Sequence, residues 1–343
     1  MRIIYGGPAL PEYHAIARSL LAPGDEIDFV LKFTPEVQDK VETADVLFGL
    51  APVTSETVHN AKRARLIQVL GAGYDGVDVA AAHAAGIVVA TVGGANATSV
   101  AEHAFALILS LCRRVPLADR AIREGRWLQL DFYRGGSHQL SGKTLGLVGL
   151  GRVGKALAKL VRGFDLQLLY YTRHPLPEDE ERALGVAYAP LAELLAQADV
   201  VSVQVPLTAE TRGLIGVAEL ALMKQEAILV NTSRGGVVDE EALCARLAER
   251  KLGGVGLDVF AVEPLDPENP LLRYDNVVLT RTWAAPRRRR CTAPSRRRSP
   301  TSPAWLPANR CSTWCSPSSA EMGVCSTACG GARLPQQTGT RIP

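Results

Sequence analysis

The sequence predicts an α/β fold built on parallel sheets. Short apolar runs alternate with helix-like stretches through the first 280 residues, and this alternation favours parallel strands joined by right-handed crossovers. The runs are almost continuously apolar, which is typical of sheets covered on both faces. The expected strands are residues 45–50, 66–70, 87–92, 144–150, 166–171, 200–204, 228–231, 255–259 and 277–280, and the expected helices are 77–85, 99–114, 152–163, 191–198 and 239–250.

The composition excludes several classes of protein. The chain has 343 residues, 47% of them hydrophobic and 21% charged, which suits a globular protein with one large or two medium domains. A membrane span is not expected, because no apolar run reaches about 18 residues. The first residues lack the apolar core and cleavage site of a signal peptide, so we expect a cytoplasmic protein.

The charge is divided unevenly along the chain. Residues 281–343 hold 11 Arg, no Lys and one acid, a net charge of +10, which leaves −7 for residues 1–280 out of the total of +3. The basic character therefore belongs to the C-terminal segment, and nucleic-acid binding by the rest of the chain is not expected. Five of the seven cysteines also lie in this segment, without paired zinc-ligand spacing, so no metal site is predicted.

A glycine-rich turn is the first chemical signal. Gly149, Gly151 and Gly154 follow an expected strand and open the expected helix 152–163. The first glycine permits a tight turn, the second lets a pyrophosphate approach the backbone, and the third allows close helix packing. The helix N-terminus then favours the phosphate charge. This context predicts a dinucleotide-binding site.

The end of the next expected strand bears on which dinucleotide binds. An acid that holds the ribose hydroxyls of NAD is expected there, but the chain has Thr172 followed by Arg173. An arginine can accommodate the 2′-phosphate of NADP, so NADP(H) is slightly favoured over NAD(H). The alternative is that Arg173 is only solvated and that NAD binds.

Several further motifs occur in a specific order. They are Gly71–Asp75 (GAGYD), Asn96–His103 (NATSVAEH), Val205–Thr211 (VPLTAET), Asn231–Gly236 (NTSRGG), and Leu257–Phe260 (LDVF) followed by Glu263-Pro264. Together with the glycine turn, they resemble the D-isomer-specific 2-hydroxyacid dehydrogenases, the group that includes phosphoglycerate dehydrogenase and glyoxylate/hydroxypyruvate reductase. The resemblance covers essentially all of residues 1–280.

The resemblance implies two doubly wound, Rossmann-like domains with the active site in the cleft between them, and a homodimer. A flavodoxin-like substrate domain would span residues 1–98, and an NAD(P)-binding domain residues 99–280. The implied reaction is hydride transfer between NAD(P)H and a small 2-keto acid. The apolar stretch 99–112 predicts a buried helix, which would lie in the core or between domains or subunits.

The resemblance also implies roles for individual residues. Arg234 would grip the substrate carboxylate and carbonyl, a task that suits the planar fork of guanidinium donors. Ala72 and Gly73 would hold the carboxylate through backbone amides, and Glu263 would orient and charge a catalytic histidine. Gln204 replaces a frequent histidine, which we interpret as tolerated variation. The implied cofactor-binding residues are Gly149, Gly151, Arg152, Val153, Gly154, Thr172, Arg173, Pro206, Thr208, Thr232, Ser233 and Asp258.

The catalytic histidine itself is missing from the expected place. In the family it follows the strand that ends here at Thr280, within a Thr-Pro-His motif, but this chain continues Arg-Thr-Trp-Ala-Ala-Pro. The six histidines are at positions 14, 59, 83, 103, 138 and 174. His103 is the best-placed substitute in sequence, yet its apolar helix predicts a packed core histidine.

A shift of reading frame is our hypothesis for this loss. If one base is missing after the Thr280 codon, each original codon combines the third base of one present codon with the first two bases of the next. Tryptophan has a single codon, so Trp283 followed by Ala284 must correspond to an original Gly. Restoring one C after the Thr280 codon then permits the sequence Thr-Pro-His-Leu-Gly-Gly-Pro. The same offset forces Val at Trp314 and permits a stop codon after Cys315. Two alternatives stay open. One is a catalytically inactive dinucleotide-binding protein or pseudogene product. The other is a fusion whose basic segment 281–343 binds nucleic acid. As written, this Arg-, Pro- and Cys-rich segment is expected to be disordered.

Overall fold

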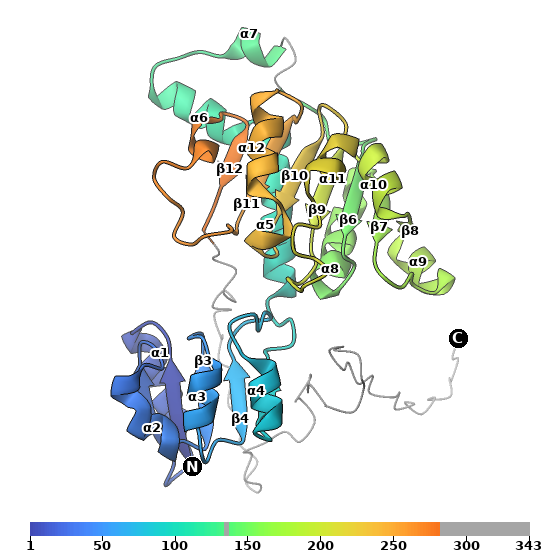
Figure 1. Ribbon diagram of the computed structural model, residues 1–343. Coiled ribbons are helices and arrows are strands. Elements are labelled where there is room, and N and C mark those ends of the chain that lie inside the picture. The colour runs from blue at the N-terminus through green and yellow to red at the C-terminus, as the bar shows by residue number, and fades with distance from the viewer. Residues whose placement is uncertain (134–136, 282–343) are drawn as a thin grey trace, which may run out of the picture. The chain divides into compact units, whose positions relative to one another are not determined.

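The computed structural model describes residues 1–133 and 137–281, which form two compact units (Figure 1). Within these residues, unit 1 ends at Gly93 and unit 2 begins at Gly94. None of the helices in the described ranges is long and apolar enough to cross a membrane. The predicted segment 281–343 lies outside the described residues apart from Arg281.

Unit 1 is a five-stranded parallel sheet in the order β2-β1-β3-β4-β5. This is the flavodoxin-like arrangement of a doubly wound sheet. Its strands are β1 (Arg2–Gly6), β2 (Glu26–Val30), β3 (Val46–Gly49), β4 (Leu66–Val69) and β5 (Val88–Ala90), and its helices are α1 (Pro11–Ser19), α2 (Gln38–Thr43), α3 (Ser55–Asn60) and α4 (Val79–Ala84).

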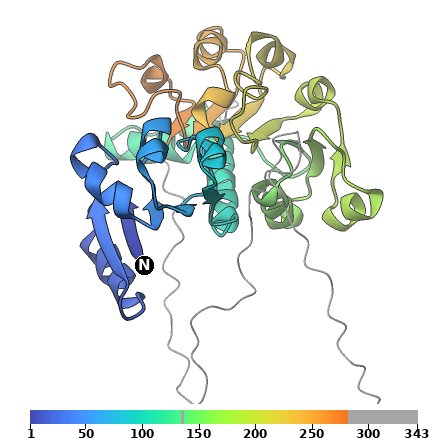
Figure 2. The same cartoon turned by 60° about the horizontal axis from the view of Figure 1, so that its bottom comes forward.

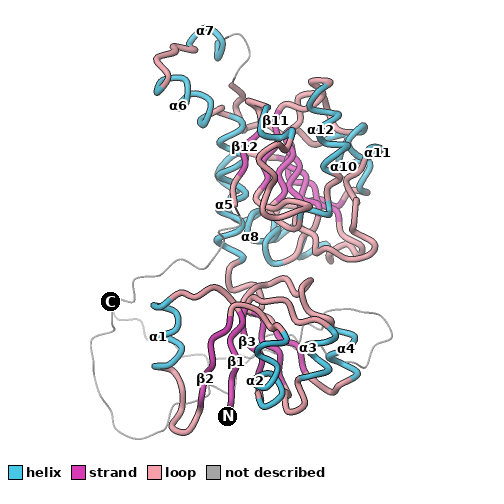
Figure 3. Tube along the Cα trace, turned by 60° about the vertical axis from the view of Figure 1, so that its left-hand side comes forward, coloured by secondary structure: helices cyan, strands magenta, loops and turns pink. Residues whose placement is uncertain are grey.

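The two faces of this sheet are covered unequally. One face packs on α2, α3 and α4, with Ile4, Leu47 and Ile67 almost fully buried. Helix α1 lies on the opposite side (Figure 3), where the His14 ring stacks on Phe29. The five residues of a cross-strand row on that face are only half-buried. They are Ile27, Ile3, Val46, Leu66 and Val88.

Unit 2 is a seven-stranded parallel sheet in the order β12-β11-β10-β9-β6-β7-β8. The order reverses between β6 and β9, as in a Rossmann sheet, where ligands bind beyond the carboxyl ends of the strands. The strands are β6 (Thr144–Val148), β7 (Gln167–Tyr171), β8 (Ala187–Tyr188), β9 (Val200–Val203), β10 (Ile228–Asn231), β11 (Gly254–Leu257) and β12 (Val277–Leu279).

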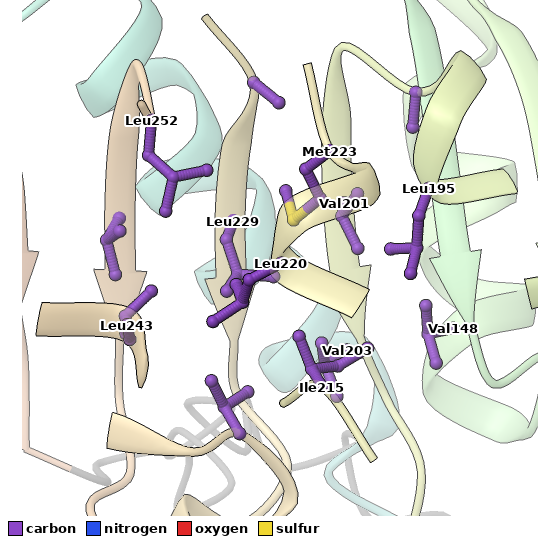
Figure 4. Close-up of a cluster of buried hydrophobic side chains, with 14 of the residues drawn as sticks. Val148, Leu195, Val201, Val203, Ile215, Leu220, Met223, Leu229, Leu243 and Leu252 are labelled. Atoms are coloured by element: carbon purple, nitrogen blue, oxygen red, sulfur yellow. The ribbon is translucent and has the colours of Figure 1, made fainter. Parts of the chain in front are cut away.

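Helices cover both faces of this sheet, as the apolar runs predict. Helices α5 and α8 lie on one side and α10, α11 and α12 on the other (Figures 1 and 2). Figure 4 shows the second of these layers, where Leu195, Leu220 and Leu243 pack on the sheet. The helices are α5 (Ala97–Cys112), α6 (Val115–Arg123), α7 (Gln129–Asp131), α8 (Arg152–Leu160), α9 (Glu178–Leu184), α10 (Leu191–Gln197), α11 (Val217–Leu222) and α12 (Glu240–Ala248).

All nine predicted strands and all five predicted helices are present, with ends that shift by a few residues. The helix predicted at 152–163 ends as α8 at Leu160 and continues as a 3-10 turn over Val161–Phe164. Helix α5 is buried as predicted along most of its length, and its apolar side chains contribute to one core of unit 2.

Candidate active site

The candidate residues of unit 2 gather at one edge of its sheet. Gly149, Gln204 and Asp258 come directly after or close to the ends of β6, β9 and β11, and Thr280 directly follows β12. The loop 232–234 follows β10 in the same way. Because the strands are parallel, all of these loops lie at the carboxyl edge, where open α/β sheets bind ligands.

The glycine turn has the geometry that a dinucleotide needs. Gly149 has a φ of +101°, and a Cβ there would lie 2.9 Å from the carbonyl carbon of Gln204. A Cβ on Gly154 would lie 2.4 Å from the carbonyl oxygen of Gly149, whereas a Cβ on Gly151 would meet no atom within 4 Å. Packing therefore requires the first and third glycines, and the second faces open space.

The helix after this turn presents its positive end. Helix α8 begins at Arg152, and its N-cap residue Gly151 provides no side-chain cap. The first backbone N–H groups of a helix have no intrahelical acceptor, so Arg152 and Val153 present theirs towards the turn. Partial positive charge at a helix N-terminus favours phosphate. These residues fit the pyrophosphate of a dinucleotide.

The two loops beside the glycine turn are polar. At the end of β7, the Thr172 hydroxyl donates to the carbonyl of His174 at 2.7 Å, and Arg173 is exposed. In the loop after β9, Thr211 donates to the carbonyl of Pro206 at 2.6 Å and accepts from the Thr208 N–H at 2.8 Å.

A carboxylate lies close to Arg173. A hydrogen bond from Thr208 is the main cause that lowers the pKa of Glu210 below its ordinary value, and the positive charge of Arg173 adds to this effect. The Arg173 guanidinium therefore lies near enough to a carboxylate to interact with it through its charge.

Asn231 builds the loop that carries Arg234. Its side-chain oxygen accepts from the Ser233 backbone N–H at 3.0 Å and from the Ser233 hydroxyl at 2.8 Å. Its amide nitrogen donates to the Arg234 carbonyl at 2.9 Å. The Arg234 guanidinium in turn donates to the Ser233 carbonyl at 2.7 Å. Asn231 was not among the predicted site residues, although it opens the NTSRGG motif.

This loop packs against the loop after β11. A Cβ on Gly235 would lie 1.9 Å from the carbonyl carbon of Phe260, so only glycine fits there. Glu263 is exposed and accepts from the Phe260 N–H at 3.1 Å. Burial raises the pKa of the neighbouring Glu240, and the charge of Glu263 adds to that rise, against the lowering effect of the Ala261 N–H bond.

Gln204 links two of the strand ends. Its amide donates to the Thr232 hydroxyl at 2.8 Å and to the Ser202 hydroxyl at 3.0 Å. Thr232 is buried, so this bond fixes the start of the loop that carries Ser233 and Arg234. Gln204 therefore has a defined structural role, which the interpretation as tolerated variation did not assign.

His103 differs from its prediction as a packed core histidine. Its side chain is 31% exposed, and its Nε2 lies 2.8 Å from the Thr280 hydroxyl and 3.2 Å from Oδ1 of Asp258. The Thr280 hydroxyl also donates to Asp258 at 2.7 Å. Helix α5 is apolar, but His103 lies near its first turns, where the helix reaches the polar edge of the sheet.

The predicted substrate-binding residues of unit 1 lie in the loop after β4. Ala72 is exposed and Gly73 half-buried. The loop is attached at its start, where the Gly71 carbonyl accepts from Val92 at 3.3 Å. It therefore occupies the carboxyl edge of the unit 1 sheet.

The described residues do not favour a thiolate nucleophile or a metal centre. Burial raises the pKa of the thiols of Cys112 and Cys244, which disfavours the reactive thiolate. Residues 1–133 and 137–281 contain no cluster of His, Cys, Asp or Glu that could hold a metal ion. The expected position of the catalytic histidine lies outside the described residues.

Comparison with known proteins identifies the family. Residues 105–282 match the model of the D-isomer-specific 2-hydroxyacid dehydrogenase NAD-binding domain. The chain belongs to the D-isomer-specific 2-hydroxyacid dehydrogenase family. Its scaffold is thus that of an oxidoreductase with a nicotinamide dinucleotide cofactor, which agrees with the geometry of the glycine turn.

Proteins similar to this chain carry the names of different enzymes. A glyoxylate reductase of Korarchaeum cryptofilum is 43% identical over 252 residues, which are 70% of this chain and 73% of that protein. A D-3-phosphoglycerate dehydrogenase of Archaeoglobus fulgidus is 42% identical over 71% of this chain, which spans 45% of that longer protein. The structure of an NAD-dependent formate dehydrogenase from Staphylococcus aureus with NAD is similar at a TM-score of 0.74 and 28% identity, over 83% of this chain and 89% of that one.

Proposed function

We propose that this chain is built for hydride transfer between NAD(P)H and a small 2-keto acid, giving a D-2-hydroxy acid. The observation that carries the proposal is the glycine turn and the Arg234 loop at one edge of a single sheet. The names of the relatives, glyoxylate reductase and D-3-phosphoglycerate dehydrogenase, support a small 2-keto acid as the substrate.

In this proposal Arg234 binds the substrate. A 2-keto acid presents a carboxylate beside a carbonyl, and a guanidinium offers paired donors that match both. The Asn231 bonds hold the Arg234 backbone in place. Ala72 and Gly73 of unit 1 would add backbone N–H donors to the carboxylate, with unit 1 as the substrate domain and unit 2 as the nucleotide domain.

The bound cofactor would supply the hydride to C2 of the substrate. The chain's own residues must stabilise the oxyanion and deliver a proton to it. Arg234 can stabilise the oxyanion. Delivery of the proton needs an acid, and the sequence has no histidine after Thr280 that Glu263 could charge and orient. The proposal therefore includes a shift of reading frame after Thr280, which removed the Thr-Pro-His motif.

The decisive experiment restores the frame. The gene is sequenced across the codons for Leu279 to Pro286, and both the chain as given and a chain with one base inserted after the Thr280 codon are purified. We expect the restored chain to reduce glyoxylate or hydroxypyruvate about 10²–10⁴-fold faster, the contribution of a positioned general acid. A His→Asn variant at the restored position is the matched control. Equal rates for all three chains would refute the proposal.

The second candidate is a dinucleotide-binding protein without turnover. The absent histidine favours it, since the glycine turn and Asp258 remain in place. Binding of NADH or NADPH to the chain as given, measured by calorimetry, together with no consumption in the presence of keto acids, would identify it.

NADP(H) is the cofactor we favour slightly over NAD(H). The support is the exposed Arg173, next to Thr172, at the position where NAD-binding members carry an acid. Replacing Arg173 with Ala should weaken NADPH binding by about tenfold, since a charge-assisted bond to phosphate is lost, and leave NADH binding unchanged. Equal effects on both cofactors would contradict this preference.

A homodimer is also part of the proposal. The segment from α6 to Tyr133 exposes five large apolar side chains, which is typical of an interaction surface. They are Val115, Ile122, Trp127, Leu130 and Tyr133. Sedimentation should give twice the chain mass, and the double variant Trp127→Ser/Leu130→Ser should give the monomer. A monomeric parent chain would refute the dimer. A cytoplasmic location stays a prediction.

A further inference from the structure

Three side chains form a hydrogen-bonded cluster at the carboxyl edge of unit 2. His103 comes from α5, Asp258 follows β11 and Thr280 follows β12. Asp258 is almost completely buried, with 3% of its side chain exposed, while His103 is 31% exposed. We call these three residues the Asp258 cluster.

The hydrogen bonds determine where His103 carries its protons. The Thr280 hydroxyl has one hydrogen, and its shortest acceptor is Oδ1 of Asp258 at 2.7 Å. It must therefore accept, not donate, in its 2.8 Å bond with His103, so Nε2 of His103 carries a hydrogen. The nitrogen that gains or loses a proton is then Nδ1. Protonation of His103 changes the charge of the cluster without breaking its hydrogen bonds.

Asp258 is the acid in direct contact with His103. Strands β10, β11 and β12, on which α5 packs, contain no titratable side chain. On α8, Lys155 pairs with Glu180 at 2.8 Å. On α6, Arg120 pairs with Asp275 and Arg123 with Asp119. The remaining charged groups of α5, α8 and the end of β12 are exposed, and they are Glu102, Arg152, Lys159 and Arg281.

We propose that His103 is a positioning residue that sets the charge beside the nicotinamide, and thereby the preference of the site for oxidised over reduced cofactor. This inference rests on the proposed function and on the family resemblance, which implies that Asp258 is a cofactor-binding residue beside the nicotinamide ring. The ring is cationic only when the cofactor is oxidised. The Asp258 carboxylate alone favours the cation, and a cationic His103 offsets that carboxylate.

The direction of the pH effect follows from these charges. With a cationic His103 the His103–Asp258 pair is neutral, and the oxidised form loses its advantage. With a neutral His103 the carboxylate charge remains, and the affinity for the oxidised form rises relative to that for the reduced form. Effects of pH on the phosphates and the adenosine cancel in this ratio, because both forms share them.

The test is a binding experiment with the full chain and needs no turnover. The dissociation constants of NAD⁺, NADH, NADP⁺ and NADPH are measured by calorimetry between about pH 5.5 and about pH 8.5, which brackets the ordinary imidazole titration. We expect the affinity ratio of oxidised to reduced form to rise about tenfold over this range, the size of one unit charge acting at a half-buried site.

Two variants fix the charge of His103 in opposite ways. His103→Gln keeps a donor to Thr280 without a charge and should give the high-pH ratio throughout. His103→Lys keeps a positive charge and should give the low-pH ratio throughout. His138→Gln is the matched control, since His138 is a half-buried histidine of the same unit outside the cluster, and it should behave as the parent chain.

The outcomes separate the inference from the proposed function. If none of the four cofactor forms binds, the proposed function fails. If they bind and the ratio does not vary with pH in the parent chain, the inference is overturned without any variant. A pH-dependent ratio that persists in His103→Gln also overturns it, because another group must then titrate.

Discussion

Arg234 shows how a single side chain depends on its neighbours. Its backbone is held by Asn231 from the end of β10, and its guanidinium is anchored to the carbonyl of Ser233. The flanking Gly235 lies against Phe260 with no space for a Cβ. The loop backbone that carries Arg234 is therefore held by Asn231 and by packing against the loop after β11, and the guanidinium is held by the Ser233 carbonyl.

The first prediction concerns the replacement of this guanidinium. In the frame-restored chain, Arg234→Lys should lower kcat/KM for a 2-keto acid by about 10²-fold or more, because an ammonium cannot pair with carboxylate and carbonyl together. Cofactor binding, measured by calorimetry, should stay unchanged. Arg182→Lys on the exposed side of α9 is the control. Unchanged kcat/KM for Arg234→Lys would contradict the substrate role.

The second prediction concerns Gly154. The new Cβ of Gly154→Ala would lie 2.4 Å from the backbone oxygen of Gly149, which cannot move without opening the turn. We expect cofactor affinity to fall at least about tenfold and the protein to lose about 1–3 kcal/mol of stability. Gly163→Ala is the matched control, since its Cβ would meet no atom within 4 Å. Equal behaviour of the two variants in calorimetry and urea unfolding would count against this packing argument.

The elements of the fold were partly predictable. The apolar strands of unit 2 could be predicted because both of their faces are buried, so their sequences are almost continuously apolar. Strands β1 and β2 were not predicted, since one face is half-buried and their runs include Arg2, Glu26 and Asp28. The two-residue strand β8 is too short to give a pattern.

The candidate site was predictable to the extent that it repeats family motifs. The glycine turn, Arg234 and Asp258 all lie at the carboxyl edge that the motifs imply. The roles of Gln204 and Thr280 depend on contacts between strand ends far apart in sequence, which a single sequence does not display. The bonds of Asn231 are local, within its own loop, and its motif could have indicated this role. His103 was predicted to be a core residue because the apolar composition of α5 gives no indication that its start reaches this edge.

The third prediction concerns the connection between β7 and α9. Tyr170 is fully buried, donates to Glu181 at 2.6 Å and accepts from the Leu176 N–H at 2.7 Å. Tyr170→Phe should cost about 1–3 kcal/mol near pH 7, because the Leu176 N–H loses its acceptor. Tyr188→Phe, on the more exposed neighbouring ring, is the control.

The pH dependence of this variant has a defined sign. Burial, with the bond to Glu181, raises the pKa of Tyr170 to about 12 from its ordinary value of 10.0. A raised pKa means that folding favours the protonated phenol, so the stability is present below about pH 10 and is lost as the pH rises towards about 12. The difference between parent and Tyr170→Phe in urea unfolding should therefore shrink in that range. A difference that grows would contradict the assignment.

At the scale of the whole molecule, the two units differ in how completely their sheets are covered. Both faces of the unit 2 sheet pack on helices. In unit 1, the row of Ile27, Ile3, Val46, Leu66 and Val88 stays half-buried on the side of α1. Parallel sheets are normally covered on both faces. This row of the unit 1 sheet is covered incompletely in the described residues.

The fourth prediction follows from this incomplete cover. The family resemblance implies a C-terminal helix that returns to the substrate domain. In the proposed restored frame, the Arg runs 287–290 and 296–298 can be recoded as Ala-rich sequence suited to such a helix. We expect the restored chain to bind less of a hydrophobic dye and to aggregate less than the chain as given, since exposed apolar surface promotes both. Dye fluorescence and light scattering measure these properties. Equal values for the two chains would contradict a return onto unit 1.

Thr280 has one more consequence, for protein engineering. Its N–H donates to the Leu257 carbonyl at 2.9 Å, and its hydroxyl completes the bonds to Asp258 and His103. Within the described residues, the pairing of β12 with β11 thus extends to Thr280. The codon after Thr280 is consequently a natural junction for chimeras, in which C-terminal segments from different relatives are joined to one constant nucleotide unit and compared side by side.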